Sequence, residues 1–196
     1  MALIEKKSRT IEYELILQAM PKDMPMLALF EITYKCNLRC VHCYCVQNAS
    51  KKELSFKEVC LIIDQLKAAG VFFINFIGGE IFVRKDVFDI LAYAKRSNFA
   101  IKITTNGTML TENKIKLLKK IGIFRLVISI YGLNESDYAN TTGSSIAYKN
   151  MTRAIGYLRK YKMPFSLIFP LLKETIKNFE RYKTFASSVG ADDYAF

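Results

Sequence analysis

The sequence lacks an apolar run long enough to cross a membrane, and its first residues lack the apolar core of a secretory signal. Its richest apolar stretches, residues 71–77 and 167–172, have the length of buried strands. Five cysteines are an odd number in a chain without a secretory signal, so a disulfide framework is not expected. These absences predict a cytoplasmic protein with no membrane partner.

Acidic residues are the scarcer charge, because 18 Asp and Glu stand against 29 Lys and Arg and leave a net charge of +11. Much of the excess falls between Lys149 and Lys183. Solvated helix faces and a surface for an anionic partner explain this excess equally well, so both interpretations stay open. The 196 residues, 51% of them hydrophobic and 24% charged, suit one folded domain.

Short apolar runs alternate with amphipathic segments from residue 27 onward. Ser55 and Glu58 form a capping-box pattern at the start of the first predicted helix, and Gly70 is placed to end it. Strands are predicted at Leu27–Thr33, Val71–Ile77, Ala100–Thr105, Phe124–Ile130, Phe165–Leu172 and Asp192–Phe196. Helices are predicted at 55–70, at Asp86–Ser97, after Thr111, around Ser145–Tyr161 and at Lys177–Val189, the last capped by Asn178.

Buried strands separated by helices predict an α/β fold with a parallel sheet. Right-handed crossovers curl such a sheet the same way at each step, so we expect a partial (β/α)6 barrel with its site at the carboxyl ends of the strands. A flat doubly wound sheet is the alternative. Residues 1–26 do not fit the repeat and are predicted to be an N-terminal extension, which packs across the base of the barrel or binds a partner. Residues 27–196 are predicted to be the core domain.

Three cysteines follow the first predicted strand at the spacing C-x3-C-x2-C, namely Cys36, Cys40 and Cys43. Thiolates are the usual ligands of iron–sulfur clusters, and three of them leave the fourth iron of a [4Fe–4S] cluster without a protein ligand. A zinc site is the weaker alternative, since it needs a fourth ligand from His42 or Cys45. The spacing therefore favours an iron–sulfur site with one open corner.

The segment from Leu29 to Tyr44, LFEITYKCNLRCVHCY, resembles the signature segment of radical S-adenosylmethionine (radical SAM) enzymes. It most resembles the branch of peptide-modifying maturases and anaerobic sulfatase-maturing enzymes, whose members often carry a cysteine-rich extension called SPASM. Three further segments are similar to the family's motifs and stand in order after successive predicted strands. They are Gly78-Gly79-Glu80, Thr104–Gly107 and Ser129–Gly132.

This resemblance implies a chemistry and a set of site residues. The open iron would bind S-adenosylmethionine, and one electron from the cluster would cleave it to a 5′-deoxyadenosyl radical that abstracts hydrogen from a substrate. An external electron donor of the flavodoxin or ferredoxin type would supply that electron. The cluster ligands would be the three cysteines, and S-adenosylmethionine would contact Gly78, Gly79, Glu80, Thr105, Asn106 and Ser129.

The chain departs from the family pattern at three places. Ile81 follows the Gly-Gly-Glu motif where relatives usually have proline, and no arginine stands between Asn140 and Gly143, where many relatives use one to hold S-adenosylmethionine. The chain also stops at the sixth predicted strand, so we expect the core to be truncated there, without the C-terminal cysteine extension. Truncation would leave the far side of the barrel open and weaken the binding of S-adenosylmethionine.

The branch resembled favours a peptide or protein side chain as the substrate. A nucleic-acid-modifying radical SAM enzyme is an alternative that the net charge suggests, although no RNA-binding module is recognisable and nucleic acid is not the expected partner. A truncated, non-catalytic iron–sulfur protein is the third hypothesis.

Overall fold

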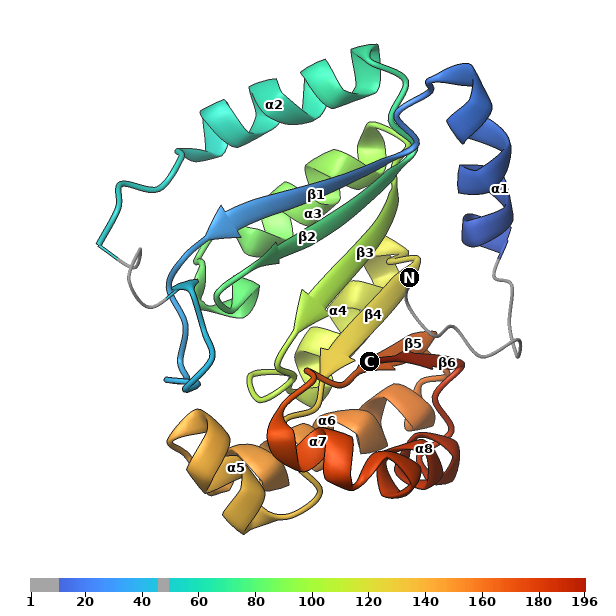
Figure 1. Ribbon diagram of the computed structural model, residues 1–196. Helices are drawn as coiled ribbons and strands as arrows, with labels where there is room; N and C mark the ends of the chain where they lie inside the picture. The colour runs from blue at the N-terminus through green and yellow to red at the C-terminus, as the bar shows by residue number, and fades with distance from the viewer. Residues whose placement is uncertain (1–10, 46–49) are drawn as a thin grey trace.

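The computed structural model describes residues 11–45 and 50–196 (Figure 1). Its strands are β1 (Leu27–Thr33), β2 (Phe73–Gly78), β3 (Ala100–Thr105), β4 (Arg125–Ser129), β5 (Phe165–Ile168) and β6 (Asp193–Ala195). Its α-helices are α1 (Ile11–Ala19), α2 (Phe56–Ala68), α3 (Val87–Arg96), α4 (Glu112–Ile121), α5 (Glu135–Thr142), α6 (Ile146–Lys160), α7 (Lys173–Lys177) and α8 (Phe179–Ser188). Two short 3-10 helices, η1 (Met20–Lys22) and η3 (Ile81–Val83), complete the described elements.

The strands form one parallel sheet in the order β1-β2-β3-β4-β5-β6, so each strand pairs with the next along the chain. A doubly wound sheet changes direction at a switch point, and the order observed here has no reversal. Because every crossover steps the same way, the sheet curls in one sense, and the predicted α/β fold of the partial-barrel type is confirmed. Helices α3, α4 and α6 run along the outside of the curved sheet (Figure 1).

The capping residues predicted from the sequence stand at the starts of α2 and α4. The Ser55 hydroxyl accepts from the Glu58 amide and the Glu58 carboxylate accepts from the Ser55 amide, which confirms the capping box of α2. Thr111 caps α4 in the same manner by accepting from the Lys114 amide. No helix in the described part of the chain combines the length and the apolar character that a membrane crossing needs.

The last third of the chain differs from the prediction. β5 ends at Ile168 rather than at residue 172, because Pro170 has no N–H to donate to a sheet. The helix predicted at Lys177–Val189 is present as α8, but the short helix α7 before it and helix α5 were not predicted. Asn178 does stand at the start of α8, but its side chain makes no capping hydrogen bond and instead accepts from Arg181 at 3.5 Å.

Helix α1 lies beside the amino-terminal ends of the strands (Figure 1). Glu12 of α1 is 6% exposed, and its carboxylate accepts from the Lys102 ammonium of β3 at 2.8 Å. This partly buried ion pair joins the helix to the sheet at the end opposite the predicted site. The boundary between an extension of residues 1–26 and a core domain stays a prediction, and residues 1–10 lie outside the described residues.

Candidate functional site

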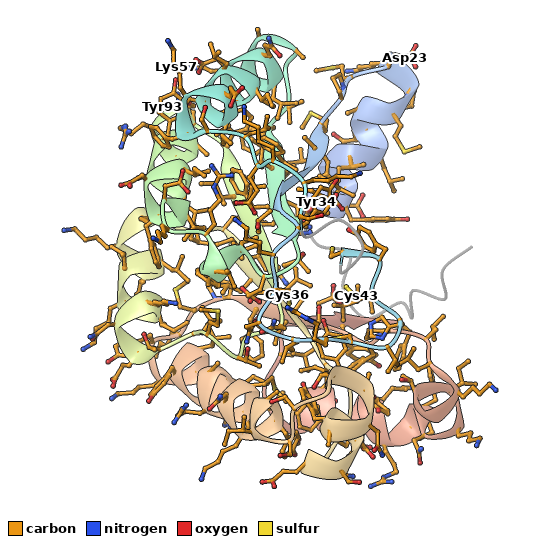
Figure 2. The ribbon with its side chains drawn as sticks, turned by 90° about the vertical axis from the view of Figure 1, so that its left-hand side faces the viewer. Asp23, Tyr34, Cys36, Cys43, Lys57 and Tyr93 are labelled. Carbon is orange, nitrogen blue, oxygen red and sulfur yellow. The ribbon has the colours of Figure 1, made fainter. Side chains whose placement is uncertain are left out.

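The cysteine loop follows β1 and lies between the sheet and α5; Figure 2 shows Cys36 and Cys43 on this loop. The Arg39 amide donates to the Thr142 carbonyl at 3.1 Å, and the Val41 amide donates to the Thr141 carbonyl at 2.9 Å. Carbonyls in the last turn of a helix have no partner inside the helix. The cysteine loop and the end of α5 therefore satisfy each other's backbone groups.

A cavity of about 440 Å³ opens at the carboxyl ends of the strands, and all six strands or the loops that follow them contribute to its lining. The three cysteines of the C-x3-C-x2-C motif line it together with Cys45 and His42. Four of the six residues expected to contact S-adenosylmethionine line it as well, namely Gly78, Gly79, Asn106 and Ser129. The sequence motifs thus converge on one cavity.

Gly78 and Gly79 stand where a side chain does not fit. A Cβ on Gly78 would overlap the Thr33 carbonyl oxygen, and a Cβ on Gly79 would overlap the backbone of Lys35. Gly78 also has a φ of +142°, which L-residues with side chains rarely adopt. The Gly79 amide donates to Thr33 at 2.8 Å, so the glycine turn lies directly against the backbone that leads to Cys36.

Glu80 and Thr105, both expected to contact S-adenosylmethionine, are not part of the cavity lining. Glu80 is fully buried, and its carboxylate accepts from the Thr105 hydroxyl at 2.7 Å, the Asn106 amide at 2.9 Å and the Phe82 amide at 3.1 Å. Burial raises the pKa of Glu80, and these hydrogen bonds oppose that rise. The two side chains join the end of β2 to the end of β3 behind the cavity.

Asn106 is 4% exposed and connects the end of β3 to the cysteine loop. Its side-chain nitrogen donates to Asn37 Oδ1 at 3.0 Å and lies 3.8 Å from Cys36 Sγ. Asn37 in turn donates to the Thr108 hydroxyl at 2.8 Å. A short polar network therefore holds the first cysteine against β3.

The thiols interact electrostatically with one another. Burial raises the pKa of Cys40 to about 12, and the neighbouring Cys36 and Cys43 add to the shift. Burial also raises the pKa of Cys36 and brings that of Cys45 to about 11. Metal binding to such thiols must release protons, because thiolates are the ligands.

The described residues contain no group of three His, Cys, Asp or Glu side chains close enough to share a single metal ion. The three motif thiols share a cavity without sharing one ion's coordination sphere. His42 lies beside them, and its ring packs on Tyr131 with centroids 5.6 Å apart. Burial lowers the pKa of His42.

The sequence analysis missed the apolar side of the cavity. This side follows β5 and β6 and consists of Ile168, Phe169, Pro170, Leu171 and Phe196. Only the position of these residues after predicted strands could have indicated them, because the carboxyl ends of parallel strands meet at one edge of the sheet. Apolar residues after a strand carry no motif, so nothing distinguished them from core.

Comparisons with known proteins agree with the motif. The model of the Radical SAM superfamily matches residues 30–186. The chain belongs to the radical SAM superfamily. Its members use a [4Fe–4S] cluster and S-adenosylmethionine. The membership that the cysteine segment predicted is confirmed.

Two curated relatives show the range of named activities. An AdoMet-dependent heme synthase of Methanosarcina barkeri is 32% identical over 174 residues, which cover 88% of this chain and 50% of the relative. The mycofactocin maturase MftC of Mycolicibacterium smegmatis is 36% identical over 115 residues, 57% of this chain and 29% of the relative. The chain spans half or less of the length of these relatives.

Solved radical SAM structures share the fold. SuiB of Streptococcus suis bound to S-adenosylmethionine matches with a TM-score of 0.74 at 17% identity, over 92% of this chain and 41% of SuiB. The structure of SuiB bound to the precursor peptide SuiA matches with a TM-score of 0.77, over 95% of this chain and 44% of SuiB. At this identity the likeness establishes the fold alone.

Proposed function

We propose that this chain cleaves S-adenosylmethionine reductively at a [4Fe–4S] cluster and abstracts hydrogen from a peptide or protein side chain. One observation carries the proposal: three thiols from one short loop line the same cavity as the glycine turn after β2 and the polar ends of β3 and β4. Such a cavity offers ligands for a cluster and a lined space beside it for a second molecule.

Cys36, Cys40 and Cys43 are assigned as the cluster ligands. They fit the group because each is a thiol, each lines the cavity, and the loop that carries them is anchored to α5 and to β3. When bound, the cluster supplies the electron that cleaves S-adenosylmethionine. An external donor of the flavodoxin or ferredoxin type is proposed to replace that electron.

The backbone of Gly78 and Gly79 and the side chain of Ser129 are assigned to bind S-adenosylmethionine, because they line the cavity beside the thiols. Asn106 lines the cavity too, but its side-chain amide is engaged by Thr108, Asn37 and Cys36, so it is assigned to pack against S-adenosylmethionine rather than to hydrogen-bond it. Glu80 and Thr105 are assigned a positioning role, since their hydrogen bonds fix the ends of β2 and β3 without reaching the cavity. The apolar side of the cavity limits the entry of water.

Two named proteins support a peptide substrate. SuiB has been crystallised with its precursor peptide and shares this fold, and MftC is a maturase with 36% identity over part of the chain. A tetrapyrrole is the second candidate, favoured by the two heme synthases and the Fe-coproporphyrin III synthase among the relatives. The net charge of +11 keeps nucleic acid as a weaker alternative to both.

One experiment tests the activity and separates the substrates. The anaerobically reconstituted protein is reduced with dithionite and S-adenosylmethionine, and 5′-deoxyadenosine is measured by mass spectrometry. Parallel reactions contain peptides from a uniformly deuterated cell digest or Fe-coproporphyrin III. Deuterium in the 5′-deoxyadenosine from the peptide reaction supports the proposal. Stimulation by the tetrapyrrole alone selects the second candidate, and no 5′-deoxyadenosine under any condition contradicts both.

A further inference from the structure

The sulfur of Cys36 has two nitrogen donors that come from different parts of the fold. The Leu38 amide lies 3.4 Å from Cys36 Sγ, within the cysteine loop itself. The side-chain nitrogen of Asn106 lies 3.8 Å from the same sulfur and comes from the end of β3, 70 residues away in sequence. A donor contributed by another strand is a property of the tertiary fold rather than of the cysteine motif.

The orientation of the Asn106 amide follows from its surroundings. Its Oδ1 accepts from the Thr108 backbone amide at 2.9 Å and from the Thr108 hydroxyl at 2.6 Å. A backbone N–H can only donate, so the atom that faces it must be the oxygen. The NH2 group is thereby turned toward Asn37 Oδ1 and Cys36 Sγ.

The backbone of Asn106 is fixed as firmly as its side chain. Its amide donates to the buried Glu80 carboxylate at 2.9 Å, and the next residue, Gly107, has a φ of +75° that forms the turn. With 4% exposure, Asn106 has little contact with competing solvent. A donor held in this way directs its dipole at the sulfur without reorganisation.

We propose that Asn106 is a positioning residue that raises the reduction potential of the cluster by donating a hydrogen bond to the Cys36 thiolate. The inference rests on the proposed function, since it takes Cys36 as a cluster ligand. Reduction adds negative charge to the cluster and its sulfurs, so an N–H donor stabilises the reduced form more than the oxidised form. Hydrogen bonds to the sulfurs are among the determinants of cluster potentials.

Two substitutions at Asn106 separate this role from loop packing. Asn106→Leu removes the donor, and Asn106→Asp keeps the shape of the side chain but turns a carboxylate oxygen toward the sulfur. Thr108→Val is the matched control, because it removes the hydroxyl from the same network and leaves the amide donor in place. If Asn106 acts only through packing, Asn106→Asp should have the midpoint potential nearest to that of the wild type. If it acts electrostatically, Asn106→Asp should have the midpoint potential furthest from it.

The midpoint potential of each reconstituted protein is measured by redox titration with electron paramagnetic resonance. At a fixed potential, Asn106→Leu is expected to lower the ratio of reduced to oxidised cluster about tenfold, which is about 59 mV for one electron. Asn106→Asp lowers it further, and Thr108→Val leaves it within about twofold of the wild type. Equal potentials in all four proteins, or a shift in Thr108→Val as large as in Asn106→Leu, overturn the inference.

A second measurement separates Asn106 from the Leu38 amide, which also donates to Cys36. Resonance Raman bands of the iron–cysteine stretch should shift on exchange into D2O, and the shift should be larger in the wild type than in whichever of Asn106→Leu and Asn106→Asp takes up a cluster, because only the wild type has both exchangeable donors. An equal shift in the wild type and the variant overturns the inference, and so do bands that stay unchanged in D2O. Failure of the wild type itself to bind a cluster contradicts the proposed function instead, so the two failures are distinguishable.

Discussion

The two sides of the cavity are built differently. On the side of β1, β2 and β3, the lining is held by specific hydrogen bonds: the glycine turn lies on the Thr33 carbonyl, Glu80 joins two strand ends, and Asn106 reaches the cysteine loop. On the side of β5 and β6, the lining is apolar and includes the exposed Leu171. The strands of the two sides also differ in length, since β1 has seven residues and β6 has three.

The polar and the apolar side of the cavity are suited to different tasks. Hydrogen-bonded positions accept few residue types, because a lost partner leaves a buried polar group unsatisfied. Apolar positions tolerate exchange among residues of similar size. We infer that the polar side fixes the cluster and S-adenosylmethionine, whereas the apolar side adapts the cavity to the substrate.

The largest expected effect concerns the three cysteines of the polar side. Replacing Cys36, Cys40 and Cys43 together by alanine should reduce iron after anaerobic reconstitution from about four atoms per chain to nearly none. Cys60→Ala is the matched control, because this thiol lies on α2 outside the cavity lining. Cys45→Ala should also keep the iron. Iron analysis checks the result. Four irons in the triple variant would contradict the assignment of the cluster to the cysteines of the polar side.

The next effect concerns the buried carboxylate that joins β2 to β3. Glu80→Ala leaves the Thr105 hydroxyl and the amides of Phe82 and Asn106 without their partner, and should lower the free energy of unfolding by about 3 kcal/mol. Glu80→Gln retains one acceptor oxygen and should cost about half as much. Urea unfolding measures both. A cost below about 0.5 kcal/mol for the alanine variant would contradict the structural role.

A smaller effect comes from the ion pair behind the polar side. Arg84 donates to the Ile32 carbonyl at 2.7 Å, and Asp86 accepts from Arg84 at the same distance. The hydrogen bond from Arg84 lowers the pKa of Asp86. A lowered carboxyl pKa contributes stability above the unfolded value of about 3.9, and that stability is lost as the pH falls through the folded value.

Asp86→Asn should therefore cost about 1 kcal/mol at pH 7 and progressively less as the pH falls below about 4. Urea unfolding of the variant and the wild type across this range measures the difference. A cost that does not change with pH would show that the pair contributes through packing rather than charge.

The smallest effect on the fold is expected on the apolar side. Leu171 is 61% exposed, so Leu171→Ala should change the free energy of unfolding by less than about 0.5 kcal/mol and leave the iron content unchanged. The affinity for the substrate that stimulates 5′-deoxyadenosine formation should fall several-fold, because the side chain lines the cavity. Unfolding curves and substrate titrations check the two halves. Loss of iron in this variant would show that the sides do not act separately.

The same contrast explains how much the sequence alone could predict. Alternating apolar runs, the Ser55 capping box and the strand-end motifs predicted the order of strands and the convergence of the cysteines with Gly78, Asn106 and Ser129, because these signals are local. The positions of Glu80 and Thr105 behind the cavity could not be predicted, since a polar residue in a motif carries no sign of which way it faces.

The later elements were harder for a different reason. Strand β5 is ended by Pro170, and α5 has no apolar periodicity strong enough to mark it, although Asn134 caps it by accepting from the Asp137 amide at 2.8 Å. The apolar lining of the cavity is chosen by tertiary packing, which a single sequence does not display. Family resemblance supplied the chemistry, and the structure supplied the division between the two sides.

The central claim is that three thiols hold a cluster with one open iron. The most direct test is electron paramagnetic resonance of the reduced, reconstituted protein, recorded with and without S-adenosylmethionine. We expect a [4Fe–4S] signal whose shape changes when S-adenosylmethionine is added, because the ligand binds the iron that no cysteine occupies. A protein that takes up stoichiometric zinc but no iron, or a cluster signal that S-adenosylmethionine leaves unchanged, would contradict the account.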